Sequence, residues 1–146
     1  AAGLSLKSTD YTAFSQAFDI AVKRQLTPFD LESVVLLDGE LTSEELSLEN
    51  GLLIRGSGPW GQHFPEPLFR GKFYIISQRI VGEKHLKLLL SLTDQGQQPI
   101  DAIAFNVDID FWLSPKKERV DIAYKVDVNF WKGRESLQLI VEFFIH

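Results

Sequence analysis

The C-terminal half of the sequence consists of five successive runs in which apolar and polar residues alternate, and this pattern restricts the fold more than any other feature. In the second run, leucine occupies positions 86, 88, 90 and 92, so these side chains fall on one face of a strand. A period of two is typical of β-strands that bury one face. We expect strands over residues 72–81, 83–93, 100–107, 120–129 and 136–145.

The connections between these runs are short and favour a closed sheet. Gly82 alone separates the first two runs, which predicts a tight hairpin or a strongly bent strand pair. Residues 94–99 form a turn, and a loop containing Trp112 and Pro115 precedes the fourth run. Five such strands without an internal helix pattern fit an OB-type barrel better than a sandwich.

The N-terminal third has a mixed pattern. Apolar residues at spacings of three and four predict an amphipathic helix over residues 9–26, which ends before Pro28. A short apolar run predicts a strand over 33–37, and Thr42 or Ser43 can cap a second helix that reaches Arg55. The predicted fold class is therefore an α+β fragment followed by an all-β five-stranded OB-type barrel.

A connector rich in proline and glycine, residues 58–71, lies between these parts. It carries Trp60 and Phe64 in a stretch too irregular for helix or strand. Aromatic residues in such a connector usually anchor it to a core, and a wall of a ligand site is the alternative. We expect the domain boundaries to give residues 1–57, 58–71 and 72–146.

Composition excludes several classes of protein and site. The chain has no cysteine, so disulfides, thiolate zinc sites and cysteine nucleophiles are excluded. It shows no signal-peptide pattern and no apolar run long enough for a bilayer, and we expect a cytoplasmic protein. The aspartates at 101, 108 and 110 are open to two interpretations, ordinary turn acids or a divalent-cation cluster, and turn acids are favoured.

Charge is unevenly distributed. The formal net charge is -5, yet residues 70–87 hold five basic side chains against Glu83 alone. A polyanion could bind such a segment despite the acidic total, and a solvated strand face is the alternative.

Several blocks of the sequence resemble the C-terminal part of the bacterial RecJ single-strand-specific exonucleases. The blocks are LLDGELTSEE (36–45), GPWGQHFPEPLF (58–69), QRIVGEKHLKL (78–88), DAIAFN (101–106) and YKVDVNFWKGRESLQLIV (124–141). They occur in the right order, and the match runs nearly end to end. The opening Ala1-Ala2-Gly3 is similar to the end of the Gly-Gly-His-x-x-Ala-Ala-Gly motif of the DHHA1 domain, so residues 1–57 are expected to be a remnant of that domain.

The resemblance implies a 5′-to-3′ exonuclease on single-stranded DNA that depends on Mn²⁺ or Mg²⁺ and acts in recombination and repair. The Asp-His-His motif of that family belongs to an N-terminal domain that this chain lacks, and His63, His85 and His146 do not reconstruct it. We therefore expect no catalysis and no metal or cofactor in this chain, whose partner is single-stranded DNA held for a catalytic core elsewhere.

An OB barrel holds single strands through a basic groove for phosphates and exposed aromatic residues for bases. Gly3 enters the candidate set through the resemblance, because its motif looks phosphate-contacting in relatives. The predicted DNA-binding residues are Gly3, Arg70, Lys72, Tyr74, Arg79, Lys84, His85, Lys87, Lys125, Trp131, Lys132 and Arg134.

The role of Trp131 and the function of the barrel each have an alternative interpretation. Trp131 either stacks on DNA or covers the barrel end, whereas Tyr124 shares a face with valines and is expected in the core. The alternative function is a protein-docking module that binds an acidic, aromatic-ended tail such as that of the bacterial single-strand DNA-binding protein.

Overall fold

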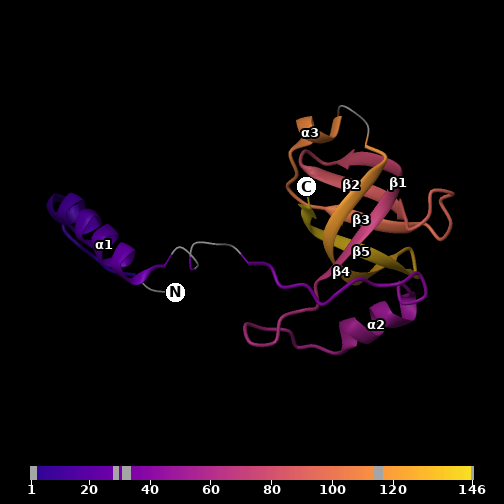
Figure 1. Ribbon diagram of the computed structural model, residues 1–146, viewed down its shortest axis with the longest axis horizontal. Coiled ribbons are helices and arrows are strands. Elements are labelled where there is room, and N and C mark those ends of the chain that lie inside the picture. The colour runs from indigo at the N-terminus through magenta and orange to yellow at the C-terminus, as the bar shows by residue number, and fades with distance from the viewer. Residues whose placement is uncertain (1–2, 28–29, 31–33, 114–116, 146) are drawn as a thin grey trace. The chain divides into compact units, whose positions relative to one another are not determined.

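The computed structural model describes residues 3–27, 30, 34–113 and 117–145 of the chain. Its contacts group the chain into two compact units, Ala1–Val35 and Leu36–His146. The second unit contains the barrel (Figure 1). The domain boundaries expected at residues 57 and 71 stay predictions, although the helix before residue 57 belongs to the same compact unit as the barrel.

The N-terminal unit contains the expected helix. A 3-10 turn, η1 (Ser8–Asp10), leads into α1 (Tyr11–Gln25), which confirms the helix predicted over residues 9–26. None of its side chains is buried, and Phe14 and Phe18 are exposed, with their rings stacked at a centroid distance of 5.7 Å. The strand predicted over 33–37 is wrong for residues 34–37, which have no regular structure and are exposed, and Ser33 lies outside the described residues. No partner strand lies beside that segment among the described residues, so its apolar pattern alone does not make a strand.

The second predicted helix starts later than expected. Thr42 and Glu45 cap one isolated turn, because the Thr42 amide donates to Glu45 Oε2 (2.8 Å) and the Glu45 amide donates to Thr42 Oγ1 (3.3 Å). These hydrogen bonds hold the pKa of Glu45 below its ordinary value. The turn buries Leu46, and a new N-cap at Ser47 then starts α2 (Leu48–Gly56).

Helix α2 packs directly on the barrel through a glycine. A Cβ at Gly51 would lie 3.0 Å from Leu137 Cδ1 and 3.1 Å from Val128 Cγ2, so a residue with a side chain would fit only if these neighbours moved. Arg55 fixes the same helix from its other end, since its Nη1 donates to the Val128 carbonyl (3.2 Å). Glycine costs about 1 kcal/mol in a helix interior, and here it permits the contact with β4 and β5.

Five strands form a closed barrel in the order β1-β2-β3-β5-β4 (Figure 1). Their bounds are β1 (Phe69–Val81), β2 (His85–Ser91), β3 (Ile100–Ala104), β4 (Arg119–Trp131) and β5 (Arg134–Ile145). β3 and β5 pair in parallel, and the other pairs are antiparallel. All five predicted strands are therefore confirmed, with boundaries that shift by a few residues.

The long strand β1 closes the barrel. Its first part pairs with β4 up to Tyr74, its second part pairs with β2 from the same residue, and the register shifts between Ile75 and Ser77. Such an irregularity lets one strand bend from one neighbour to the next.

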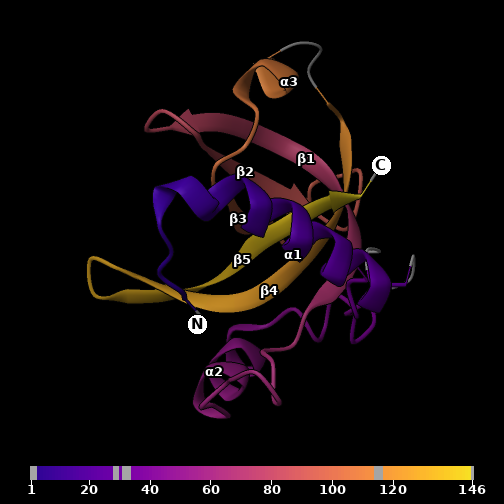
Figure 2. The ribbon, with the colours of Figure 1, turned by 90° about the vertical axis from the view of Figure 1, so that its left-hand side faces the viewer.

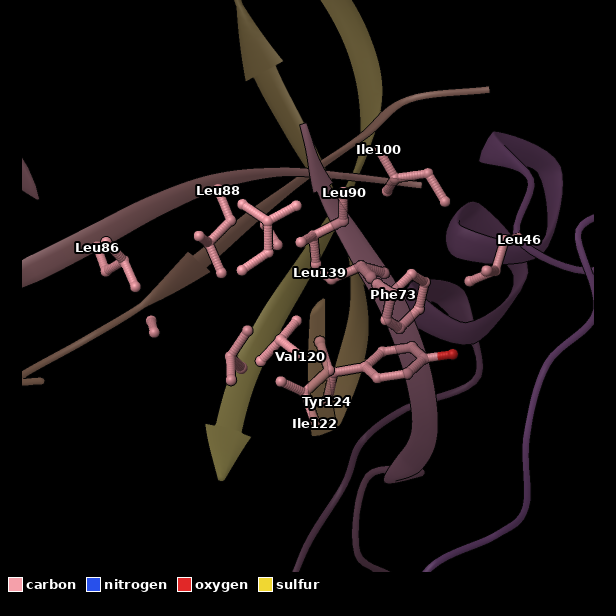
Figure 3. Close-up of a cluster of buried hydrophobic side chains, with 14 of the residues drawn as sticks. Leu46, Phe73, Leu86, Leu88, Leu90, Ile100, Val120, Ile122, Tyr124 and Leu139 are labelled. Carbon is pink, nitrogen blue, oxygen red and sulfur yellow. The ribbon is translucent and has the colours of Figure 1, made fainter. Parts of the chain in front are cut away.

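The core is built from the faces that the alternation predicts. Figure 3 shows Leu86, Leu88 and Leu90 of β2 pointing into the barrel with Tyr124 of β4. Tyr124 is fully buried and meets Phe73 edge-on at 5.6 Å, which confirms its expected core role. Its hydroxyl has no hydrogen-bond partner among the described residues, and burial raises the pKa of Tyr124 above its ordinary value.

A short helix, α3 (Ile109–Leu113), stands between β3 and β4, where the sequence predicted only a loop. Asp108 Oδ1 accepts from the Asp110 amide (3.1 Å) and starts this single turn. Burial of Trp112 stabilises this turn, because the Trp112 side chain lies at the barrel end with its ring 4.6 Å from that of Phe144. One helical turn is too short to leave a periodic pattern in the sequence.

Contrary to the expectation from the sequence, the aromatic residues of the connector do not anchor it to the core. Trp60 packs on Phe64, with ring centroids 5.0 Å apart, and neither belongs to the buried core. Phe64 is 59% exposed.

No helix within the described residues is long and apolar enough to cross a membrane.

Candidate nucleic-acid interface

The turn between β1 and β2 carries two of the predicted cations. Arg79 on β1 and Lys84 in the turn are exposed, and neither forms an ion pair with any described residue. His85 is half-buried beside them, where its Nδ1 accepts from the Asn106 amide (3.3 Å) and its ring meets Phe105 at 5.1 Å. The end of β1 and the turn therefore present two positive charges that have no ion-pair partner among the described residues.

The turn between β4 and β5 carries the aromatic candidate. Lys132 and Gly133 both have positive φ, 48° and 78°, as a tight hairpin turn requires. Trp131 precedes them, is 69% exposed, and has the Lys132 ammonium 5.9 Å from its ring centroid. Arg134 pairs with Trp131 across the hairpin and is also exposed. Trp131 thus does not cover the barrel end.

Both turns lie on the same side of the barrel in Figure 2, one above the other, and the strand order puts β3 between β2 and β5. We call the set that flanks these turns the hairpin surface. It consists of Arg79, Lys84, His85, Trp131, Lys132 and Arg134.

Three other predicted cations are neutralised. Arg70 holds Asp121 by two hydrogen bonds, from Nε to Oδ1 (3.1 Å) and from Nη2 to Oδ2 (2.8 Å). The hydrogen bonds between Arg70 and Asp121 raise the pKa of the guanidinium and lower that of the carboxyl. Lys87 pairs with Asp101 on β3 (3.0 Å).

Lys125 lies between two carboxylates, Glu142 at 3.1 Å and Glu66 at 3.4 Å. Burial alone would lower the pKa of Lys125, but the hydrogen bonds and charges of both acids outweigh it and raise the pKa. The alternation of apolar and polar residues places Lys87 and Lys125 on the polar faces of their strands, but each one meets an acid there. Their attraction for a polyanion is correspondingly weakened.

Lys72 and Tyr74 lie on a different part of the barrel, on the face of β1 and β4. The Arg119 guanidinium lies 4.3 Å from the centre of the Tyr74 ring, and its Nη2 donates to the Tyr74 hydroxyl (2.6 Å). Beside them is a pocket of about 360 Å³, the Tyr74 pocket, with Lys72 and Arg119 among its polar lining residues and Phe73 and Leu92 among its apolar ones.

Arg119 is the residue that sequence reasoning missed. The fourth run was expected to start at Val120, so Arg119 fell in the preceding loop. Its spacing of two from Asp121 was the available signal, because it continues the outward face of β4. Gly3, the remaining candidate, is exposed and belongs to the N-terminal unit.

A family model described as the RecJ OB domain matches residues 37–142. The chain belongs to the RecJ OB domain family. The match extends from the segment before α2 into β5 and thus covers the connector and both turns of the hairpin surface. The resemblance drawn from the sequence blocks and the predicted OB-type barrel are both confirmed.

Curated relatives of the RecJ OB domain carry the name single-stranded-DNA-specific exonuclease RecJ. Those from Salmonella typhimurium and Dickeya dadantii are 44% and 46% identical over 142 residues, which is 97% of this chain and 24% of each relative. The one from Haemophilus influenzae is 41% identical over 145 residues, 98% of this chain and 25% of the relative. The chain therefore spans about a quarter of the length of the curated relatives that it matches.

Two crystal structures of RecJ from Thermus thermophilus share this fold. The complex with Mg²⁺ superposes with a TM-score of 0.70 at 20% identity, covering 96% of this chain and 21% of the solved one. The complex with Mn²⁺ gives the same TM-score at 21% identity, covering 99% of this chain and 20% of the solved one.

The described residues of this chain offer no site for the Mg²⁺ or Mn²⁺ of these crystal structures. Across the described residues, no three histidine, aspartate or glutamate side chains gather where they could hold a metal ion. Asp101 is instead engaged by Lys87, and Asp108 caps α3. We therefore derive no chemical step through a metal in this chain.

Proposed function

We propose that the hairpin surface holds single-stranded DNA, as the non-catalytic part of a RecJ-like 5′-to-3′ exonuclease of recombination and repair. The observation that carries this proposal is the 69% exposure of Trp131 on a tight hairpin turn, next to the unpaired charges of Lys132 and Arg134. A base that stacks on such an exposed aromatic side chain contributes about 1–3 kcal/mol, and stacking is tolerant of sequence because every base has a flat face.

The charges on the hairpin surface support the same ligand. Arg79 and Lys84 at one turn, and Lys132 and Arg134 at the other, have no carboxylate partner among the described residues. Unpaired cations bind phosphates and release the counterions of the strand, so affinity falls as salt rises. A strand that passes between the turns can use both pairs.

The proposed place of this chain in a longer enzyme follows from its relatives. They are single-stranded-DNA-specific exonucleases, and this chain spans about a quarter of their length. In the proposal, residues 1–57 are the end of a DHHA1-like domain, with Gly3 near the DNA, and the barrel feeds the strand to a metal-dependent core outside this sequence.

The test is a fluorescence-anisotropy titration of a labelled single-stranded oligonucleotide. Trp131→Ala should weaken binding by about 1–3 kcal/mol, the value of one stacked base. Phe64→Ala is the matched control, because Phe64 is similarly exposed on the connector. Equal affinities of the wild-type chain and Trp131→Ala would contradict the proposal.

A second candidate function is docking of an acidic, aromatic-ended protein tail, such as that of the bacterial single-strand DNA-binding protein. The Tyr74 pocket favours it, because Leu92 can contact an aromatic ring while Lys72 and Arg119 attract carboxylates, and Asp121, which also lines the pocket, is already held by Arg70. Arg119→Ala should then reduce binding of an acidic peptide that ends in phenylalanine and leave oligonucleotide binding unchanged. A peptide with an amidated C-terminus that binds equally well would count against docking.

A further inference from the structure

A second pocket, of about 370 Å³, opens at the end of the barrel where β3, α3 and β5 meet. Three aromatic residues contribute to its walls, Phe105, Trp112 and Phe144, and the last two pack together at 4.6 Å. Its polar lining comes from Asn106, Asp108 and Glu142. We call it the Phe105 pocket.

The Phe105 pocket adjoins the hairpin surface. The Phe105 ring meets the His85 ring edge-on at 5.1 Å, and the Asn106 amide donates to His85 Nδ1 (3.3 Å). The Val107 amide donates to the Lys84 carbonyl (2.9 Å). The turn that carries the free Lys84 charge is thus bonded to the rim of the pocket, so a strand that reaches Lys84 arrives at the pocket entrance.

The lining suits a nucleobase better than a phosphate. Asp108 and Glu142 bring two carboxylates to the pocket, and no described lysine or arginine lines it, so a phosphate would find no cation there, although Lys125 offsets the charge of Glu142. Phe105 is 51% exposed, so its ring is available to a flat ligand. Single strands are read in this way by proteins that stack an unpaired base on an aromatic side chain and hydrogen-bond its edge.

We propose that the Phe105 pocket takes one base of the bound single strand and prefers guanine. This inference rests on the proposed DNA-holding function. Carboxylates only accept hydrogen bonds, and guanine offers N–H donors on its pairing edge. Glu142 already binds Lys125, but a carboxylate has about four lone-pair sites, so acceptor capacity remains. The Asn106 side-chain amide adds both a donor and an acceptor.

The experiment compares two labelled thymidine oligonucleotides by anisotropy, one with a single deoxyguanosine and one with a single deoxyadenosine at the same position. Because the strand can shift along the barrel, the guanine can reach the pocket. The wild-type chain should bind the guanine strand about fivefold more tightly, which is the lower end of the discrimination that one pair of hydrogen bonds to a base edge gives. Phe105→Ala should bring this ratio to about one. Phe143→Ala is the control, because Phe143 is 48% exposed on β5 and does not line the pocket.

The outcomes separate this inference from the proposed function. If the wild-type chain shows no guanine preference, while Trp131→Ala weakens binding of both strands, the pocket inference is overturned and the DNA-holding proposal stands. If deoxyinosine, which lacks the 2-amino group, binds as tightly as deoxyguanosine, the assignment of the base edge is overturned. Binding of neither strand would overturn both proposals.

Discussion

Arg70 on β1 and Asp121 on β4 form a two-bond ion pair across the closing strands of the barrel, diagonal to the Cα register in which Lys72 faces Asp121. The pair joins the strand that bends between β2 and β4 to its neighbour. It therefore belongs to the closure of the barrel and not to the hairpin surface.

This pair gives a pH-dependent prediction. Hydrogen bonding to Arg70 lowers the pKa of Asp121 below its ordinary 3.8, so the stabilisation is present above that pH and is lost as pH falls through the lower folded value. Arg70→Ala should lower the free energy of unfolding at pH 7, and its difference from wild type should shrink at pH 3. Urea unfolding at the two pH values measures this, and a difference that does not depend on pH would contradict the role of the pair.

Arg70→Ala should also leave affinity for single-stranded DNA nearly unchanged, because Asp121 neutralises the guanidinium. The same anisotropy titration checks this. If Arg70→Ala lost as much affinity for single-stranded DNA as Trp131→Ala, the strand would have to cross the face of β1 and β4.

The neutralised cations show where sequence reasoning stops. Alternation correctly placed Lys87 on the outer face of its strand, since Leu86 and Leu88 on either side of it are buried. It could not show that Asp101 reaches Lys87, because the two residues come from different strands and meet diagonally in the β2–β3 register. Register between strands depends on the whole barrel, and a single run of residues does not contain it.

The strands were predictable for a related reason. Each has a buried face that repeats every second residue, so the pattern and the fold agree. By contrast, α3 exists because Trp112 fills the barrel end, and the late start of α2 follows from the isolated turn that buries Leu46. Both depend on tertiary contacts that outweigh local preference.

The close approach of α2 to the barrel gives a stability prediction. Gly51→Leu should lower the free energy of unfolding by about 1–3 kcal/mol, because the added side chain collides with Leu137 and Val128. Gly56→Leu in the same helix is the control, since a Cβ there meets nothing within 4 Å. Chemical unfolding of both variants decides the point, and equal effects would mean that α2 does not pack as described.

The buried hydroxyl of Tyr124, which has no hydrogen-bond partner among the described residues, gives a further prediction about stability. Tyr124→Phe should leave the free energy of unfolding unchanged or raise it by up to about 1 kcal/mol, because a buried hydroxyl without a partner costs free energy. Burial raises the pKa of Tyr124 above its ordinary 10.0, so the neutral form is favoured in the folded state and wild-type stability falls as pH rises above 10.

Tyr124→Phe should therefore lose less stability than wild type between pH 9 and pH 11. Thermal unfolding of both proteins across that pH range shows whether the variant or the wild type loses more stability. A clear loss of stability in Tyr124→Phe at pH 7 would mean that the hydroxyl makes a hydrogen bond in the folded chain.

In the proposed function, single-stranded DNA binds the hairpin surface through cations that have no carboxylate partner among the described residues. The most direct measurement is the dependence of oligonucleotide affinity on salt for the wild type, for Lys132→Ala with Arg134→Ala, and for Lys125→Ala, with a duplex as the control ligand. Each lost phosphate contact lowers the salt slope by about 0.7 for a single strand, so the double variant should lose about 1.4. Lys125→Ala, whose charge is already neutralised by Glu142 and Glu66, should keep most of the wild-type slope. Binding by the wild type should weaken as salt rises and should prefer the single strand. Absence of binding at low salt, or an unchanged slope in the double variant, would contradict DNA binding by the hairpin surface.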